Sequence, residues 1–190
     1  MVFAIMMAYA LLTFNWFFAE KIHREKIFLT MATHQPFPFI VTFYLIHTAL
    51  ASGGVYEHFS WNHLILLFIF ALPVTAWETS RKVRAADKET TYVTFSKIFG
   101  ARGATVIPLV CLLLTHALAI YMGEVLNFSV SYFVVMLVLL IYMLFYYVRF
   151  IINPVHENNV LKNTTMIFTT LLFLNILVHT LLSYGITVKL

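Results

Sequence analysis

Long apolar runs alternate with shorter polar stretches along the 190-residue chain. Six runs have about the 20 residues that a helix needs to cross the hydrocarbon core of a bilayer. They cover approximately residues 2–19, 37–53, 61–77, 104–123, 130–152 and 165–187. Only helices satisfy all backbone groups within one such run, and the runs are too long and too apolar for barrel strands. The pattern therefore predicts an all-α fold, a polytopic bundle of six transmembrane helices that forms a single domain over residues 1–190.

Turn-forming residues mark the ends of several runs. We expect Ser52-Gly53-Gly54 to end the second helix, Gly123 the fourth and Pro154 the fifth. The polar stretches after the first, third and fifth runs are longer than those after the second and fourth. Function is therefore expected at the end of the bundle where the three longer stretches meet.

Composition supports a membrane environment. Hydrophobic residues make up 62% of the chain and charged residues 11%, whereas soluble domains carry about 25% charged residues. The net charge of +4 does not indicate nucleic-acid binding, because the basic residues flank the apolar runs, where they set orientation. The single cysteine, Cys111, lies inside the fourth run and cannot form an internal disulfide.

Basic residues are distributed unequally between the two sides of the predicted bundle. With six spans, loops 20–36, 78–103 and 150–164 share one side. These loops and their flanks carry eleven Lys and Arg residues, whereas the other side carries only Lys189. The positive-inside rule then predicts that the three loops are cytoplasmic and that both chain ends are external.

Residues 77–104 form the longest polar stretch and hold half of the Lys and Arg residues. If the third helix continues past Trp77, then Glu78, Lys82 and Glu89 fall on one stripe of it. Carboxylates on such a stripe can hold Mg²⁺, and the cations between them can bind phosphate oxygens. The alternative is that these cations serve only to set topology.

Three histidines, His47, His116 and His179, lie at comparable depth within predicted spans. Bis-histidine haem ligation and neutral hydrogen bonding between helices are the two interpretations, and we favour hydrogen bonding. Three tyrosines near the end of the fifth span fit an aromatic belt or the wall of an isoprenoid chamber; they are Tyr142, Tyr146 and Tyr147. We expect Asn158 and Asn159 to lie in a solvated loop.

Two polar segments resemble the UbiA superfamily of intramembrane prenyltransferases. Residues 77–104, WETSRKVRAADKETTYVTFSKIFGARGA, resemble its second acidic motif, a carboxylate-rich loop that runs through a Thr- or Ser-containing segment to a Gly. The residues that match in order are Glu78, Arg81-Lys82, Arg84-Ala85, Asp87, Glu89, Thr94, Ser96-Lys97 and Gly100. Residues 16–36, WFFAEKIHREKIFLTMATHQP, are similar to the family's loop after its fourth helix, through Lys21, Arg24, Lys26 and His34-Gln35. The chain would then correspond to helices four to nine of a nine-helix fold.

The resemblance implies an Mg²⁺-dependent enzyme that transfers a prenyl group from a polyprenyl diphosphate to an aromatic or similar small-molecule acceptor. It implies that Glu78, Asp87 and Glu89 hold Mg²⁺. The diphosphate would be bound by five basic residues, Lys21, Arg24, Arg81, Lys82 and Lys97. The resemblance implies no catalytic residue beyond these ligands, and no haem.

Two departures from the family pattern bear on activity. The family's first motif, NDxxDxxxD or a relative, does not occur in these 190 residues. In the second motif Glu78 stands at the first acidic position, but Lys82 lies four residues later. We therefore expect the chain to be the C-terminal portion of such an enzyme, or a decayed one, and to be inactive alone. The alternatives are a non-enzymatic membrane protein that binds anionic lipid head groups and a haem-bearing helical bundle.

Overall fold

The computed structural model describes residues 2–52, 59–89 and 93–185 of the chain, and every regular element in this part is helical. The α-helices are α1 (Val2–Phe14), α2 (Glu20–Glu25), α3 (Ile27–His34), α4 (Pro36–Ser52), α5 (Trp61–Ser80), α6 (Phe95–Val125), α7 (Val130–Ile152) and α8 (Leu161–Tyr184). Three short 3₁₀ helices lie in connections: η1 (Trp16–Phe18), η2 (Ala86–Lys88) and η3 (His156–Asn158). The all-α fold predicted from the sequence is confirmed.

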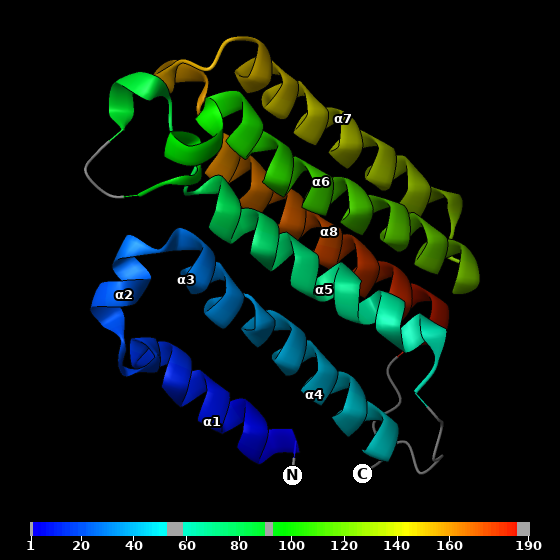
Figure 1. Cartoon of the computed structure of the whole chain (residues 1–190). Helices are drawn as coiled ribbons and strands as arrows, with labels where there is room; N and C mark the ends of the chain where they lie inside the picture. Colours follow the sequence, from blue (N-terminus) through cyan, green and yellow to red (C-terminus); the bar gives the residue numbers. More distant parts are fainter. Residues whose placement is uncertain (1, 53–58, 90–92, 186–190) are drawn as a thin grey trace.

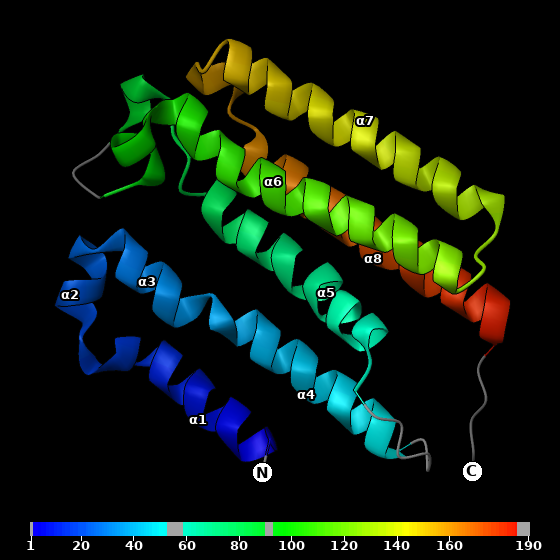
Figure 2. The same ribbon diagram turned by 45° about the vertical axis from the view of Figure 1, so that its right-hand side comes forward.

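The four C-terminal helices form a closed ring. Helix α5 packs on α6, α6 on α7 and α7 on α8, and α8 returns to α5 (Figures 1 and 2). Helices α1 to α4 form an arm beside this ring, in which α1 packs on α4 and α4 packs on α5. We refer to α5–α8 as the ring and to α1–α4 as the arm.

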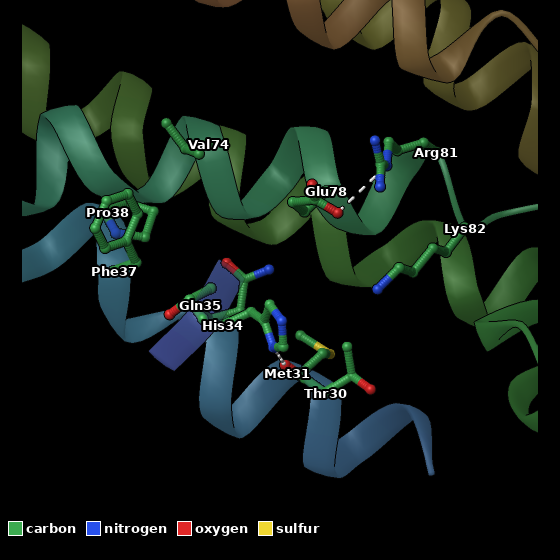
Figure 3. A pocket seen from close by; sticks show the side chains of 11 residues that line it. Thr30, Met31, His34, Gln35, Phe37, Pro38, Val74, Glu78, Arg81 and Lys82 are labelled. Atoms are coloured by element: carbon green, nitrogen blue, oxygen red, sulfur yellow. Dashed lines mark hydrogen bonds and ion pairs between the residues drawn. The ribbon is translucent and has the colours of Figure 1, made fainter. Parts of the chain in front are cut away.

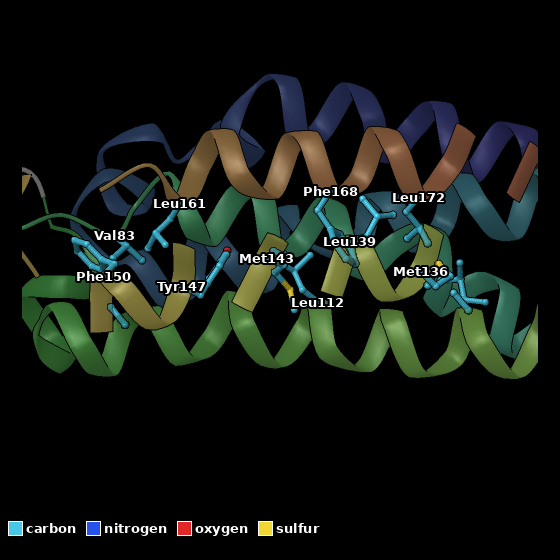
Figure 4. Packing of buried hydrophobic residues seen from close by; sticks show 14 of the residues in the cluster. Val83, Leu112, Met136, Leu139, Met143, Tyr147, Phe150, Leu161, Phe168 and Leu172 are labelled. Atoms are coloured by element: carbon cyan, nitrogen blue, oxygen red, sulfur yellow. The ribbon is translucent and has the colours of Figure 1, made fainter. Parts of the chain in front are cut away.

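The hydrophobic core lies inside the ring. Leu112, Met136, Met143, Tyr147 and Phe168 are completely buried there, and they come from α6, α7 and α8 (Figure 4). Close packing of large side chains from several helices fixes one arrangement of the ring. In the arm, by contrast, α1 has no buried residue.

In the part of the chain that the structure describes, four helices are long and apolar enough to cross a membrane, namely α5, α6, α7 and the helix that ends at Tyr184. The two long arm helices are shorter, since α1 has 13 residues and α4 has 17, or about 20 and 25 Å at 1.5 Å per residue. The first predicted span covers residues 2–19, but the α-helix observed there, α1, ends at Phe14. Phe17 and Phe18 then take positive φ values of 50° and 57°, which breaks the helix. The count of six spans stays a prediction.

Several local predictions were wrong. Loop 20–36 consists largely of the helices α2 and α3. Gly123 does not end the fourth span, because α6 continues to Val125, and Gly123 is buried against Tyr132. Pro154 does follow the end of α7 as predicted, and α7 covers the predicted range 130–152.

The three longer connections lie at one end of the molecule. The side-chain amide of Asn159, between α7 and α8, donates to the carbonyl oxygen of Val83, between α5 and α6, at 3.0 Å. The arm connection through α2 and α3 lies at the same end (Figure 1). At the opposite end the Tyr184 hydroxyl donates to the Leu126 carbonyl oxygen at 3.0 Å, which joins the end of α8 to the α6–α7 turn. The three connections thus lie at one end of the structure, and the membrane topology predicted for them stays a prediction.

Candidate functional site

A cavity of about 390 Å³ lies where the arm meets the ring (Figure 3). Its walls come from α3, the start of α4, the end of α5 and one residue of α1. The lining residues are Thr13, Thr30, Met31, His34, Gln35, Phe37, Pro38, Val74, Glu78, Arg81 and Lys82. We call it the joint cavity. Its volume falls within the range of roughly 300–1,000 Å³ that is typical of small-molecule sites.

The basic wall of the cavity exists because α5 ends at Ser80. The Thr79 hydroxyl donates to the carbonyl oxygens of Thr75 and Ala76, at 2.9 and 3.0 Å. The Ser80 hydroxyl donates to the Trp77 carbonyl oxygen at 2.9 Å. Such back-bonding competes with continuation of the helix. Helix α5 continues past Trp77 only to Ser80, with Arg81 as its C-cap residue, so Glu89 does not share a helical stripe with Glu78 and Lys82.

Charges of both signs meet at this end of α5. The Arg81 Nε lies 3.3 Å from a Glu78 carboxylate oxygen, and the guanidinium lies over the Trp77 ring at 5.0 Å from its centroid. Burial lowers the pKa of Lys82 below its usual value; Glu78 opposes this shift and Arg81 adds to it. Arg81 is thus held in place on two sides, while Lys82 carries a charge that is incompletely solvated.

The arm contributes His34 and Gln35 to the opposite wall. The His34 Nδ1–H donates to the Thr30 carbonyl oxygen at 3.0 Å, which fixes the ring orientation. Burial is the main cause that lowers the pKa of His34, and His23 and Lys82 also lower it. The side-chain oxygen of Gln35 is buried and has no hydrogen-bond partner. An unpartnered buried side-chain oxygen in the lining of a cavity is a feature that a bound ligand would explain.

The structure brings together only part of the predicted diphosphate-binding set. Arg81 and Lys82 line the joint cavity. Lys21 on α2 and Lys97 on α6 are exposed and do not line it. The side chain of Arg24 lies outside the described residues. Of the two segments that resemble the family, one supplies Arg81 and Lys82 to the cavity, and the other supplies His34 and Gln35 to the opposite wall.

The three predicted Mg²⁺ ligands lie in different surroundings. Glu78 lines the joint cavity, whereas Asp87 is exposed in η2. Glu89 accepts hydrogen bonds from the Thr94 hydroxyl on both carboxylate oxygens, at 2.9 and 2.8 Å. Among the residues that the structure describes, no three His, Cys, Asp or Glu side chains gather as potential metal ligands. The arrangement does not fit one ion held by these three carboxylates, so Mg²⁺ binding stays a prediction.

The three histidines have different surroundings. His179 on α8 contacts the Ser131 hydroxyl of α7 through Nε2 at 3.0 Å, and its Nδ1–H donates to the Asn175 carbonyl oxygen at 2.9 Å. Hydrogen bonding between helices is confirmed for this residue. His116 is buried beside Phe168 and its Nδ1 has no hydrogen-bond partner, whereas His47 is exposed and stacked on Phe43, so hydrogen bonding between helices stays a prediction for these two.

Two features of this end were missed from the sequence. Asn158 and Asn159 are not simply solvated: the Asn158 amide donates to the Asn153 carbonyl oxygen at 2.9 Å, and Asn159 ties two connections together. Tyr147 belongs to the core rather than to an interfacial belt, since it is fully buried and its hydroxyl lies 2.6 Å from that of Thr165. An asparagine pair has no local signal that distinguishes a tie between loops from a solvated turn.

Comparisons with protein-family models, with curated proteins and with solved structures gave no match.

Proposed function

We propose that the joint cavity binds the diphosphate end of a polyprenyl diphosphate, and that the chain is part of a UbiA-like membrane prenyltransferase. The observation that carries the proposal is that two segments far apart in the sequence supply one cavity. Arg81 and Lys82 come from one segment, and His34 and Gln35 come from the other. These are the two segments that resemble the family.

The charge distribution suits a diphosphate. Lys and Arg make strong charge-assisted hydrogen bonds to phosphate oxygens. An anion beside Lys82 would offset the burial and the Arg81 charge that lower the pKa of this amine. Glu78 keeps Arg81 in place at 3.3 Å, so it acts as a positioning residue in this arrangement. Rotation of the Gln35 amide would present its NH₂ group as a further donor.

The apolar lining suits the first part of an isoprenoid chain. Phe37, Pro38 and Val74 lie next to the charged residues in the same cavity. In prenyl transfer the bond between the allylic carbon and the diphosphate oxygen breaks, and the electron pair leaves with the diphosphate. The acceptor then bonds to that carbon and loses a proton. Arg81 and Lys82 would stabilise the charge that develops on the leaving diphosphate. The role of Mg²⁺ stays a prediction of the resemblance.

Binding of radiolabelled geranylgeranyl diphosphate to the purified chain in nanodiscs tests the proposal. Lys82→Gln should weaken binding about tenfold or more, because it removes one charge-assisted contact. Inorganic diphosphate and geranylgeraniol should each bind more weakly than the complete amphiphile. Lys26→Gln is the matched control, since Lys26 is an exposed cation at the same end that does not line the cavity. Equal affinity of wild type and Lys82→Gln would refute the proposal.

A further inference from the structure

A second cavity, of about 310 Å³, lies at the same end of the ring, between the α5–α6 and α7–α8 connections. We call it the basic cavity. Its ionisable lining residues are all basic, with Arg81, Arg84 and Lys88 from the first connection and His156 and Lys162 from the second. No carboxylate lines it in the described part of the chain, whereas Glu78 lines the joint cavity. A concave site lined by positive charge concentrates the electrostatic field and attracts anions.

The walls of the basic cavity are tied to each other. The Asn159 side-chain amide donates to the Val83 carbonyl oxygen at 3.0 Å, which joins the two connections. The backbone N–H of Arg84 donates to the Ser96 hydroxyl at 2.6 Å, which anchors this residue to the start of α6. The cations are therefore mounted on connections that are fixed to each other and to the ring. Such preorganisation lowers the cost of binding.

An apolar groove lies along α5 and α8 in the half of the ring nearer this end. It has a volume of about 290 Å³ and is lined by Pro73, Val74, Trp77, Met166, Thr169 and Thr170. Helix α5 ends and α8 begins at the basic cavity, and the two helices pack together. Trp77 precedes Ser80 by three residues, and Met166 follows Lys162 by four. The groove therefore begins about 5 Å farther along the helices than the basic cavity, which Ser80 and Lys162 line. A basic end followed by an apolar channel matches the shape of a phospholipid.

We infer that an anionic phospholipid occupies this site, with its phosphate in the basic cavity and an acyl chain in the α5–α8 groove. Charge complementarity selects an anionic head group over a zwitterionic one, because the ionisable lining residues are all basic. Trp77 lies between the two parts, and its indole N–H is buried without a hydrogen-bond partner. The ester carbonyl groups of a phospholipid lie between its phosphate and its acyl chains, so they would reach the depth of this donor. The inference does not depend on the proposed function, although the lipid site shares two residues with the joint cavity: Arg81, which also lines the basic cavity, and Val74, which also lines the groove.

Quenching of Trp77 fluorescence by brominated lipids tests the inference. Trp16→Phe and Trp61→Phe leave Trp77 as the single tryptophan of the full chain, which is reconstituted into phosphatidylcholine vesicles. Phosphatidylglycerol with brominated acyl chains should quench Trp77 at a mole fraction at least about fivefold lower than brominated phosphatidylcholine requires. The double variant Lys88→Gln/Lys162→Gln should abolish this preference, because each cation near a membrane surface contributes about a fivefold gain in affinity.

The double variant Lys21→Gln/Lys26→Gln is the matched control. It removes the same charge from exposed positions of the arm that line neither cavity, and it should keep the preference. Equal quenching by the two lipids in the single-tryptophan protein would overturn the inference. An equal loss of the lipid preference in the two double variants would also overturn it. Inorganic phosphate at constant ionic strength should not relieve the quenching. Relief would mean that the basic cavity takes free phosphate, and it would overturn the assignment of a lipid.

Discussion

The ring and the arm have similarly apolar helices, but they differ in what those helices bury. In the ring, α6, α7 and α8 enclose fully buried side chains such as Leu112, Tyr147 and Phe168. In the arm, α1 has no buried residue, and the arm is attached to the ring through the packing of α4 on α5 and of Phe28 on α3 against Phe95 and Phe99 on α6. Apolar composition thus predicts insertion into a membrane, whereas the complementary shapes of side chains decide which helices form a fixed unit.

The joint cavity lies where these two regions meet. Arm residues such as His34 and Gln35 face ring residues such as Glu78, Arg81 and Lys82 across it. A ligand in this cavity contacts both regions at once. Its binding energy therefore stabilises the docking of the arm on the ring, in addition to whatever packing α4 and α5 supply.

The largest effect that we predict concerns the ring. A Cβ atom at Gly123 would lie 2.4 Å from the Tyr132 ring, and that ring is pinned because its hydroxyl donates to the Ala119 carbonyl oxygen at 2.9 Å. Gly123→Ala should lower the free energy of unfolding by about 2 kcal/mol through overpacking, despite the better helix propensity of alanine. SDS-titrated unfolding in mixed micelles measures this.

Gly103→Ala is the control on the same helix. Its Cβ atom would meet only the Cβ atom of the exposed Phe99, at 3.2 Å. It should leave stability unchanged or raise it slightly, since alanine favours the helix by up to about 1 kcal/mol. Equal losses from the two substitutions would contradict the close α6–α7 contact.

A smaller effect separates the ring from the arm. Tyr147→Phe removes the buried contact of its hydroxyl with Thr165 at 2.6 Å and should lower global stability by about 1 kcal/mol. Tyr9→Phe removes a hydrogen bond of similar length, 2.8 Å, to the Thr33 carbonyl oxygen in the half-buried arm. It should leave global unfolding unchanged and increase amide exchange only in α1 and α3. A global loss as large as that of Tyr147→Phe would show that arm and ring unfold as one unit.

The sequence predicted the helices better than their partners. Apolar length located α7 to the residue, because a membrane span needs a near-constant number of apolar residues. It could not predict that α5 to α8 close a ring, because apolar periodicity does not show which helices are neighbours. The location of Gly123 inside α6 was missed for a similar reason, since only the Tyr132 ring on α7 explains a glycine there.

The candidate site was predicted in halves. Charge patterning and family resemblance located Glu78, Arg81 and Lys82, and resemblance also located His34 and Gln35. The sequence also allowed the third helix to continue to Glu89, but α5 ends at Ser80, and apolar periodicity does not show where a helix ends within a polar stretch. The exclusively basic lining of the second cavity depends on the tie from Asn159 to Val83, which joins connections that are distant in sequence.

Hydrogen exchange with and without geranylgeranyl diphosphate tests most directly whether the proposed ligand binds between arm and ring. At a ligand concentration of 100 Kd, amides of α3 and of residues 78–84 should both exchange more slowly, by up to about a hundredfold. The α6–α7 turn at residues 126–129, at the opposite end, should not change. Protection of both walls, lost together in Lys82→Gln, is the result we predict. Protection of one wall alone, or equal protection at residues 126–129, would contradict binding in the joint cavity.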